Sequence, residues 1–429
     1  MALTDLEART GPTPEQVVVI GGGVVGLCCA DHLSRAGHRV TVVDRAAADY
    51  RGCSFGNAGM VTPSHFIPLA APGMTALALR LLPDPEGPLS VRIPPPAGFV
   101  EWGRRFVEAA TPARCSRAAS VLAALGLASR ELHRELAAEV GDAQALRADG
   151  IMMVCREADT FHEEIEVAYR ARELGIEAEV LAADEIERVE TGVRVRAAGA
   201  VYFPGDMFLS PEALVRALRT RLVGRGVRFE TGRDALGWRR EGPRLRALVT
   251  RTGEIAGDAF VAAAGSWTGE LLRRVGLNLP LQAGKGYSVT LDPAEKRPRV
   301  ASLLLEARVA VTPMGEGVRF AGTMEFSGLD STQSRARVRG MCRSIPGYLP
   351  DYAAETLERL PAWSGLRPCS PDGLPYVGRT RRASNLWVAT GHAMLGVTLA
   401  PITGRLIAQM VRSEPPEIHS ELLSPDRYA

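Results

Sequence analysis

The feature that most constrains the fold is a glycine motif near the start of the chain, Gly21-x-Gly23-x-x-Gly26. It follows a short run of β-branched residues, 17–20, which is typical of a strand buried on both faces. It precedes a helix predicted over residues 24–36. Gly21 permits a tight turn, Gly23 lets the backbone approach a pyrophosphate, and Gly26 lets the helix pack close to the sheet. The pattern predicts a β-α-β unit that binds a dinucleotide.

An acidic residue, Asp44, lies at the end of the next predicted strand. Its carboxylate can accept hydrogen bonds from a ribose diol and would repel a 2′-phosphate, so NADP is disfavoured. The glycine motif alone is weak evidence, because a glycine-rich turn without function would look the same. Strand, helix and acid together favour a nucleotide site.

A second glycine turn, near the end of the chain, favours FAD over NAD as the bound cofactor. Gly391, His392 and Gly396 follow a strand predicted over residues 386–390, and a helix begins near Thr398. The start of a helix supplies N–H donors and a positive potential, which would stabilise the negative charge of a reduced flavin. A nicotinamide enzyme needs no such turn, although a turn used only for packing remains the alternative.

Strands of the dinucleotide-binding type occur at the start, in the middle and at the end of the sequence, and the stretches between them alternate differently. The economical interpretation is a discontinuous Rossmann-like nucleotide domain of α/β class with a second, α+β domain inserted twice. The expected nucleotide-binding segments are 15–92, 205–284 and 363–412. The expected substrate-domain segments are 93–204 and 285–362.

Composition excludes several classes of protein. Hydrophobic residues make up 46% and charged residues 23% of the chain, which is ordinary globular usage. The 51 basic and 49 acidic residues leave a net charge of +2, which gives no reason to expect a nucleic acid partner. The seven cysteines form no CxxC pair, so neither a disulfide framework nor a metal site is expected. A reducing, cytoplasmic setting is the simplest expectation.

Several runs resemble known flavoenzymes. Cys53-Ser-Phe-Gly-Asn-Ala-Gly59 and Lys285-Gly-Tyr-Ser288 resemble the bacterial FAD-dependent D-amino-acid dehydrogenases. Trp363-Ser-Gly-Leu-Arg-Pro368 and the stretch 391–401 are similar to the wider amino-acid oxidase group, including glycine and sarcosine oxidases. The resemblance extends over about residues 17–410.

The resemblance implies a mostly antiparallel sheet laid across the flavin, with the substrate between them. Hydride would pass from the substrate Cα to flavin N5, giving an imino acid that water converts to a 2-oxo acid. Sarcosine oxidases tether their flavin to a cysteine where this chain has Gly365, so non-covalent FAD is expected. The residues expected to bind FAD are Gly21, Gly23, Val25, Gly26, Asp44, Arg45, Ser54, Asn57, Ala58, Gly59, Gly265, Gly391, His392, Gly396 and Thr398.

In relatives of glycine-oxidase type, the arginine of the Gly-Leu-Arg-Pro motif binds the substrate carboxylate. The resemblance assigns this role to Arg367, whose planar guanidinium matches a carboxylate in two hydrogen bonds. The alternative is a structural ion pair with Asp372. Glycine oxidases carry a tyrosine at the position of Ala310, which moves the interpretation away from glycine as substrate.

Three further residues are candidates for the catalytic site. The run Pro63-Ser-His-Phe66 resembles dehydrogenases of D-proline and cis-4-hydroxy-D-proline, so His65 is a candidate to bond a ring hydroxyl or polarise the substrate amine. A surface histidine is the alternative. Tyr287 and Lys285 are candidates to face the flavin, with Lys285 holding a water near N5.

The hypothesis is therefore a FAD-dependent dehydrogenase of D-amino acids, with D-proline or cis-4-hydroxy-D-proline as substrate. The alternatives are an oxidase of glycine or an N-methyl amino acid that yields hydrogen peroxide, a non-catalytic flavin subunit of a larger dehydrogenase, and a nicotinamide dehydrogenase. A quinone or an electron-transfer protein is the expected electron acceptor. Residues 74–82 and the arginine-bearing helices after Val100 would allow peripheral contact with the inner face of the cell membrane, and packing within the second domain is the alternative.

Overall fold

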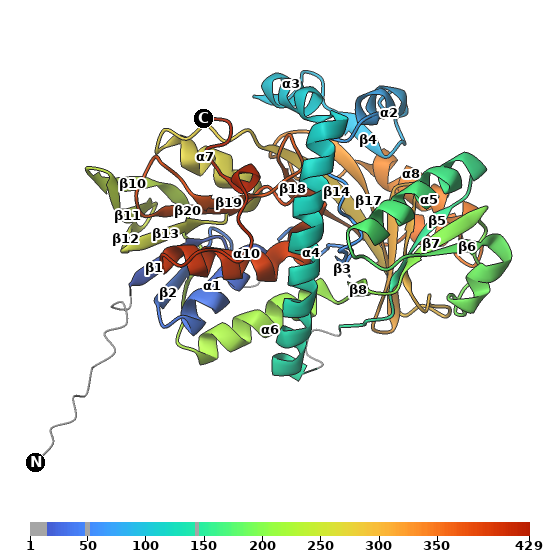
Figure 1. The fold of residues 1–429 in the computed structure, drawn as a ribbon, viewed down its shortest axis with the longest axis horizontal. Coiled ribbons are helices and arrows are strands. Elements are labelled where there is room, and N and C mark those ends of the chain that lie inside the picture. Colours follow the sequence, from blue (N-terminus) through green and yellow to red (C-terminus); the bar gives the residue numbers. More distant parts are fainter. Residues whose placement is uncertain (1–14, 48–51, 142–145) are drawn as a thin grey trace, which may run out of the picture.

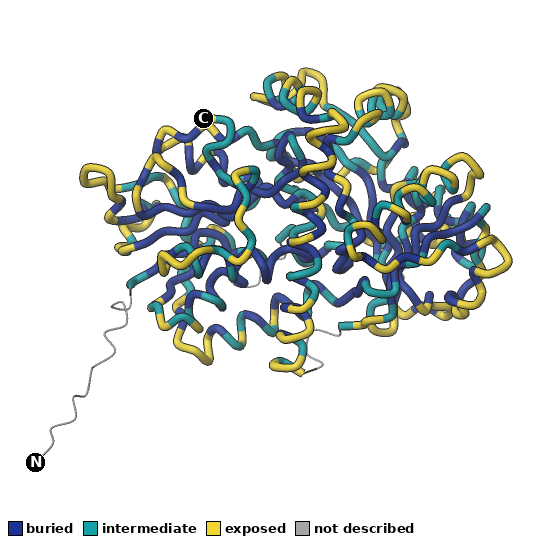
Figure 2. Tube along the Cα trace, viewed as in Figure 1, coloured by how far each residue is buried: buried dark blue, intermediate teal, exposed yellow. Residues whose placement is uncertain are grey.

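The computed structural model describes residues 15–47, 52–141 and 146–429. Two large sheets lie beside each other, and a long helix, α4 (Pro112–Val140), runs along the middle of the view between them (Figure 1). The buried backbone is concentrated in the two sheets and in the helices that cover them (Figure 2). This is the expected combination of a Rossmann-like domain with a second, sheet-based domain, and the predicted fold class is confirmed.

The first sheet has the strand order β19-β20-β13-β1-β2-β9 among the described residues. β1 (Gln16–Ile20) lies between β13 (Ala259–Ala262) and β2 (Arg39–Val43), and all three run parallel. Residues 17–20 of β1 are all β-branched and all buried, which is the pattern expected of a central parallel strand covered on both faces. The other strands of this sheet are β9 (Arg228–Glu230), β19 (Tyr376–Arg379) and β20 (Leu386–Thr390).

Two helices cover one face of this sheet. α1 (Val24–Arg35) and α10 (Gly396–Val411) pack closely because Gly404 has no side chain, and a Cβ there would lie 2.4 Å from the Cys28 carbonyl oxygen. Among the described residues, one helical stretch, Ala393–Val411, is long and apolar enough to cross a membrane. In this fold it is a core helix, with 67% of that window buried.

The second sheet has nine strands, and its main path is β18-β14-β17-β16-β15-β5-β7-β6, with β4 beside β17. Most neighbours are antiparallel, as predicted; the β15–β5 and β17–β4 pairs are parallel. Its strands are β4 (Leu89–Val91), β5 (Ile151–Cys155), β6 (Glu179–Ala182), β7 (Gly199–Phe203), β14 (Gln282–Leu291), β15 (Ala301–Leu304), β16 (Val309–Met314), β17 (Gly317–Phe326) and β18 (Ala362–Cys369).

The structure corrects three predicted domain boundaries, the first of them at residue 92, because β4 (Leu89–Val91) pairs with β17 in the nine-stranded sheet. Residues 363–412 were assigned to the nucleotide domain, but β18 pairs along its whole length with β14 in the nine-stranded sheet. β14 itself begins at Gln282, ahead of the predicted boundary at residue 285. Arg367 therefore projects from the second sheet, and only the chain after β18 returns to the nucleotide domain.

The remaining elements connect or cover these two sheets. The chain breaks between α3 (Phe99–Ala109) and α4 at Thr111, because the Thr111 side chain caps α4 and Pro112 occupies the first turn of that helix. Further helices are α2 (Met74–Leu81), α5 (Ala158–Glu173), α6 (Pro211–Gly224), α7 (Thr268–Arg273), α8 (Arg335–Ser344) and α9 (Ala354–Glu358). Two smaller sheets consist of β3 (Met60–Val61) with β8 (Met207–Phe208), and of β10 (Ala235–Glu241), β11 (Arg244–Thr250) and β12 (Gly253–Ala256).

Candidate functional site

A cavity of about 510 Å³ lies at the carboxyl ends of β1, β2 and β13, where ligands bind in open α/β sheets. Its volume falls in the range of sites for small molecules and cofactors. Residues from β18 and from the start of α10 also line it, so it extends from the nucleotide domain to the second sheet. The predicted residues that line it are Gly21, Gly23, Val25, Asp44, Arg45, Ser54, Asn57, Gly265, Arg367, His392 and Gly396.

The glycine motif forms the turn that the sequence predicted. Gly21 has a φ of 117°, and a Cβ there would lie 2.2 Å from the Ala263 carbonyl oxygen. Gly26 does not line the cavity, but a Cβ on it would lie 1.9 Å from the Gly21 carbonyl oxygen, so its absence lets α1 approach β1. Gly23 stands at the N-cap of α1 without a side-chain cap. The Ser54 hydroxyl accepts a hydrogen bond from the Val24 N–H, and the other N–H groups at this positive end would face a pyrophosphate.

Asp44 holds the same turn from the end of β2. One carboxylate oxygen accepts a hydrogen bond from the Gly22 N–H at 2.6 Å, and the other accepts one from the Ala46 N–H at 2.8 Å. Each oxygen keeps a second lone pair. The carboxylate borders the cavity beside the glycine turn, as expected for a group that binds a ribose diol.

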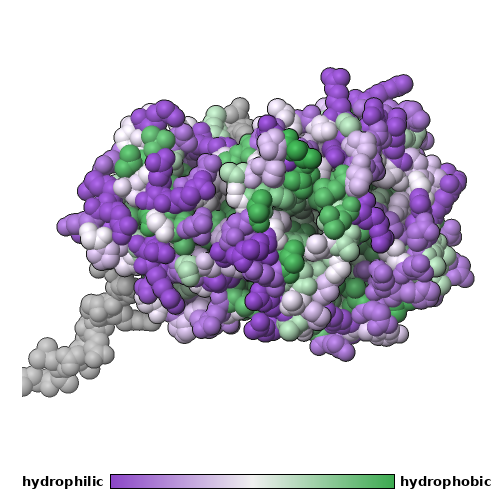
Figure 3. All heavy atoms as spheres, turned by 90° about the horizontal axis from the view of Figure 1, so that it is seen from above, coloured by the Kyte–Doolittle hydropathy of each residue, from purple (hydrophilic) through white to green (hydrophobic). Residues whose placement is uncertain are grey.

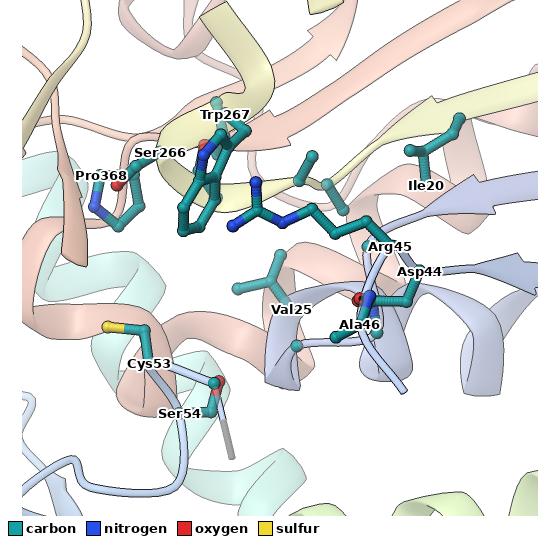
Figure 4. Close-up of a pocket in the computed structure, with 18 of the residues that line it drawn as sticks. Ile20, Val25, Asp44, Arg45, Ala46, Cys53, Ser54, Ser266, Trp267 and Pro368 are labelled. Carbon is teal, nitrogen blue, oxygen red and sulfur yellow. Dashed lines mark hydrogen bonds between the residues drawn. The ribbon is translucent and has the colours of Figure 1, made fainter. Parts of the chain in front are cut away.

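An aromatic residue that the sequence analysis missed stands across the cavity from Asp44. The Arg45 guanidinium lies over the Trp267 ring, 3.6 Å from its centroid, and both residues border the cavity (Figure 4). The pair joins the turn after β2 to the short helix after β13, which are more than 200 residues apart in the sequence. Such a stack holds the guanidinium in one direction.

Arg367 reaches the cavity from β18. Its Nη1 donates a hydrogen bond of 2.5 Å to the Thr323 carbonyl oxygen, and Gly286 on β14 leaves room for the guanidinium. Burial lowers the pKa of Arg367 below its ordinary value. The alternative of an ion pair with Asp372 is wrong, because that carboxylate pairs with Arg427 at 2.7 Å. Among the described residues Arg367 has no carboxylate partner, so its positive charge is available to an anionic ligand.

Two of the four residues predicted at the C-terminal glycine turn line the cavity, His392 and Gly396. The His392 Nε2 bonds the Thr403 hydroxyl at 2.9 Å, and burial lowers the pKa of this imidazole to about 3. Thr398 does not face the cavity, because its hydroxyl donates to the Met60 carbonyl oxygen at 3.1 Å. Gly391 serves the turn, since its φ is 84° and a Cβ would lie 2.8 Å from the Tyr376 ring.

The loop over residues 52–59 is only partly at the cavity. The Ser54 hydroxyl accepts a hydrogen bond from the Val24 N–H at 3.1 Å and so caps the start of α1, while Asn57 also borders the cavity. Ala58 and Gly59, which were also expected to bind FAD, do not line the cavity. Gly59 instead packs on the chain ahead of α6, where a Cβ would lie 2.1 Å from the Leu209 carbonyl oxygen.

Lys285 and Tyr287 lie on the face of the second sheet opposite Arg367, which corrects the prediction that they face the flavin. Gly284 and Gly286 alternate with them along β14; a Cβ on Gly286 would meet the Arg367 guanidinium, and one on Gly284 would meet Met324 and Cys369. The Tyr287 hydroxyl instead donates to Glu325 at 2.7 Å. The Lys285 ammonium lies 3.0 Å from the same carboxylate.

His65 does not line the cavity, but it is not an ordinary surface histidine either. Its Nδ1 is buried with no hydrogen-bond partner, and burial lowers the pKa of the imidazole to about 4. The neighbouring Ser64 bonds the buried Asp206 through both its N–H and its hydroxyl, which fixes this loop. His65 is therefore a half-buried histidine that stays neutral at neutral pH and whose Nδ1 lacks a partner.

These features fit FAD. Glycines leave room for a ligand at the end of β1, the start of α1 points its positive end at the cavity, and the Asp44 carboxylate borders the cavity where it would meet a ribose. No group of histidine, cysteine or acidic side chains within residues 15–47, 52–141 and 146–429 could hold a metal ion.

Comparisons with known proteins identify the family. Residues 16–410 match the family of FAD dependent oxidoreductases known as DAO. The chain belongs to this family. It is 36% identical over 421 residues to a D-amino acid dehydrogenase of Methylobacterium nodulans, covering 96% of this chain and 99% of the relative. It is 32% identical to a D-amino-acid oxidase of Bradyrhizobium diazoefficiens, covering 97% and 100%.

The fold of this DAO-family chain matches that of glycine oxidase from Geobacillus kaustophilus with a TM-score of 0.76 and 23% identity, covering 97% of this chain and 99% of the other. The protein is therefore an FAD-dependent oxidoreductase, and the predicted cofactor is confirmed. The expected nicotinamide alternative is excluded by this family membership.

Proposed function

We propose that this chain oxidises a small D-amino acid to its imino acid, with FAD held non-covalently in the cavity. The observation that carries the proposal is Arg367, a buried guanidinium with no carboxylate partner among the described residues, at the end of the cavity formed by the second sheet. A zwitterionic substrate supplies the missing carboxylate. Full-length relatives named D-amino acid dehydrogenase support the choice of substrate class.

The residues of the chain bind and orient the substrate. Bound FAD would supply the acceptor for the hydride that leaves Cα; the substrate ammonium first gives a proton to solvent, and the nitrogen lone pair then forms the C=N bond of the imino acid. Arg367 pairs with the carboxylate, which turns the Cα hydrogen toward the cavity. The positive end of α10, which begins at Gly396 beside the cavity, stabilises negative charge that arises there. Water outside the site hydrolyses the released imino acid to a 2-oxo acid.

Non-covalent attachment is supported by the two cysteines near Arg367. Cys369 is fully buried and does not line the cavity, and burial raises the pKa of its thiol to about 12. Cys53 does line the cavity, but burial raises the pKa of its thiol to about 11. Both thiols therefore stay protonated at neutral pH and are poor nucleophiles. Release of free FAD on acid precipitation tests this part of the proposal.

We further propose that the preferred substrate is D-proline or cis-4-hydroxy-D-proline. Support for this choice comes from the run Pro63-Ser-His-Phe66, which resembles dehydrogenases of these substrates; His65 lies outside the cavity lining, and its buried Nδ1 has no hydrogen-bond partner. In His65→Leu we expect kcat/KM to fall more for the hydroxylated ring than for D-proline, by about tenfold, the worth of one hydrogen bond. An equal fall for both substrates would remove His65 from this role.

For the electron acceptor we propose a quinone or an electron-transfer protein, with the enzyme in the cytoplasm and in peripheral contact with the inner face of the membrane. Large hydrophobic side chains are exposed on and around α2 and α3, including Ile93 at 91% and Val100 at 76%. Figure 3 looks onto the side of the molecule that carries α2 and α3 and shows hydrophobic atoms grouped near its middle. Sedimentation with lipid vesicles, compared with the Val100→Ser variant, tests the contact.

The main experiment is anaerobic bleaching of the bound flavin with paired D- and L-proline, cis-4-hydroxy-D-proline, D-alanine and glycine. We expect bleaching by the D-amino acids and none by L-proline. Bleaching by glycine alone, with peroxide formed in full yield in air, would instead favour a glycine-oxidase type, and no bleaching at all would favour a non-catalytic subunit.

The arginine is tested by substitution in the same assay. Arg367→Leu should raise KM about tenfold or more while FAD is retained, because a hydrogen bond to a charged group contributes ~1.5–3 kcal/mol. Arg343→Leu, on the exposed surface of α8, is the control and should behave as wild type. An unchanged KM in Arg367→Leu would refute the proposed role.

A further inference from the structure

An ionic cluster lies under the second sheet, on the face opposite Arg367. The Lys285 side chain is 1% exposed and that of Glu325 is 15% exposed, and their charged atoms are 3.0 Å apart. The Tyr287 hydroxyl donates to Glu325 at 2.7 Å and accepts from the Ser334 N–H at 3.1 Å. Lysine is almost never buried without a partner, so a cluster placed here must offset a large desolvation cost.

The cluster spans an irregularity between β14 and β17. Lys285 lies opposite Glu325 and Tyr287 opposite Gly322, so Thr323 and Met324 together oppose Gly286. Two residues facing one make this a β-bulge, which bends the strand and redirects its groups. The three side chains of the cluster come from positions on either side of the bulge.

The bulge is strained at Thr323. Its φ is 66°, in the left-handed region that a β-branched residue rarely adopts, and its hydroxyl is buried with no hydrogen-bond partner. Such a conformation persists only where the surroundings determine it. The Thr323 carbonyl oxygen is the one that accepts the 2.5 Å hydrogen bond from Arg367. The direction of the guanidinium therefore depends on the geometry of the bulge.

We propose that Glu325, with Lys285 and Tyr287, positions Arg367 by holding the Thr323 bulge in place. Glu325 ties the two strands together through both of its oxygens, one to the lysine and one to the tyrosine. Lys285 also donates to the Thr332 carbonyl oxygen at 2.6 Å, which fixes the chain that leads into α8. The inference rests on the proposed role of Arg367 as the residue that binds the substrate carboxylate.

The first test is steady-state kinetics of Glu325→Gln and Tyr287→Phe with a D-amino acid. We expect KM to rise about fivefold to tenfold in Glu325→Gln, with kcat changed by less than about twofold and FAD content unchanged, because the cluster affects how tightly Arg367 binds the substrate carboxylate. Tyr352→Phe is the matched control, since it removes one hydroxyl bond, to the Lys296 carbonyl oxygen at 2.9 Å, in the same domain. If Glu325→Gln does not fold, Tyr287→Phe provides the test.

The second test is a double-mutant cycle with Arg367→Lys. If the cluster acts through Arg367, adding Glu325→Gln to Arg367→Lys raises KM no further, whereas independent effects would multiply. Multiplying effects, or a KM in Glu325→Gln equal to that of Tyr352→Phe, would overturn this inference and leave the role of Arg367 intact. An unchanged KM in Arg367→Lys and Arg367→Leu would instead refute the proposed function and this inference with it.

Discussion

The substitution Gly286→Ala tests the site geometry without removing any functional group. A Cβ at position 286 would lie 2.1 Å from Nη2 of Arg367, 2.3 Å from Cζ and 2.5 Å from Nη1. Ordinary contact begins near 3.4 Å, so the guanidinium must move by about 1.3 Å. The guanidinium is the end of a flexible side chain, so we expect a small cost to folding and a large change in its position.

The expected effect follows from the hydrogen bonds at stake. Displacement by that distance breaks at least one hydrogen bond between the guanidinium and a substrate carboxylate, which contributes ~1.5–3 kcal/mol. KM for the D-amino acid should therefore rise about 10-fold to 100-fold. The FAD content should stay as in wild type, because Gly286 does not line the cofactor cavity.

The assay is reduction of an artificial electron acceptor across a range of substrate concentrations, with flavin absorbance as the measure of FAD content. Gly103→Ala is the control, because that glycine lies in α3 and a Cβ there would meet no atom within 4 Å. A Gly286→Ala enzyme with the KM of wild type would refute the placement of Arg367 at the substrate. Loss of FAD from this variant would refute the claim that a change at Gly286 affects substrate binding without affecting cofactor binding.

Three further predictions concern the cofactor end and the loops that frame it. Trp267→Leu should weaken FAD binding by about threefold to tenfold, because it releases the Arg45 guanidinium from its stack; fluorescence titration of the apoprotein with FAD measures this. Arg319→Met should lower the melting temperature and speed FAD release, because Arg319 holds the Phe55 carbonyl oxygen at 2.9 Å. Burial raises the pKa of Asp206 to about 7, so the folded protein keeps a proton that the unfolded chain releases near pH 4, and the free energy of unfolding should fall as pH rises between these values. Asp206→Asn should remove that part of the slope in denaturation measured across pH, and identical slopes would contradict the prediction.

The nucleotide end of the site could be predicted from the sequence because its chemistry is local. Gly21 and Gly23 lie in the turn after β1 and Gly26 lies in the first turn of α1, and Gly21 and Gly26 stand where a Cβ would collide with the backbone, as their spacing predicted. The stack of Arg45 on Trp267 could not be predicted in this way, since nothing near either residue in the sequence indicates the other.

The substrate end was harder to predict because it depends on which face of a strand is turned inward. Lys285 and Tyr287 have the side chains that a catalytic site uses, yet it is the glycine between them, Gly286, that faces Arg367. The signal was present in the sequence, because two glycines at a spacing of two leave room on one face of a strand for a large neighbour. Which neighbour fills that room depends on the pairing of β14 with β18.

The boundary error at β18 has a related cause. The run Trp363-Ser-Gly-Leu-Arg-Pro368 contains no alternation of apolar and polar residues and includes a proline, so it does not predict a strand. It forms a strand because β14 offers it a partner along its whole length, and its free edge tolerates the proline.

The loop over residues 52–57 explains how two sheets can present one site. On the nucleotide side, Ser54 caps the start of α1. On the side of the second sheet, Ser288 donates to the Gly56 carbonyl oxygen at 3.1 Å, and the Trp363 ring lies where a Cβ of Gly56 would stand, 2.0 Å away. The loop is thus bonded to the helix that faces the cofactor phosphates and to the strands that carry Arg367. In the proposed reaction, hydride transfer depends on the distance between cofactor and substrate, and a short loop fixed to both sheets would set that distance more rigidly than a hinge between domains.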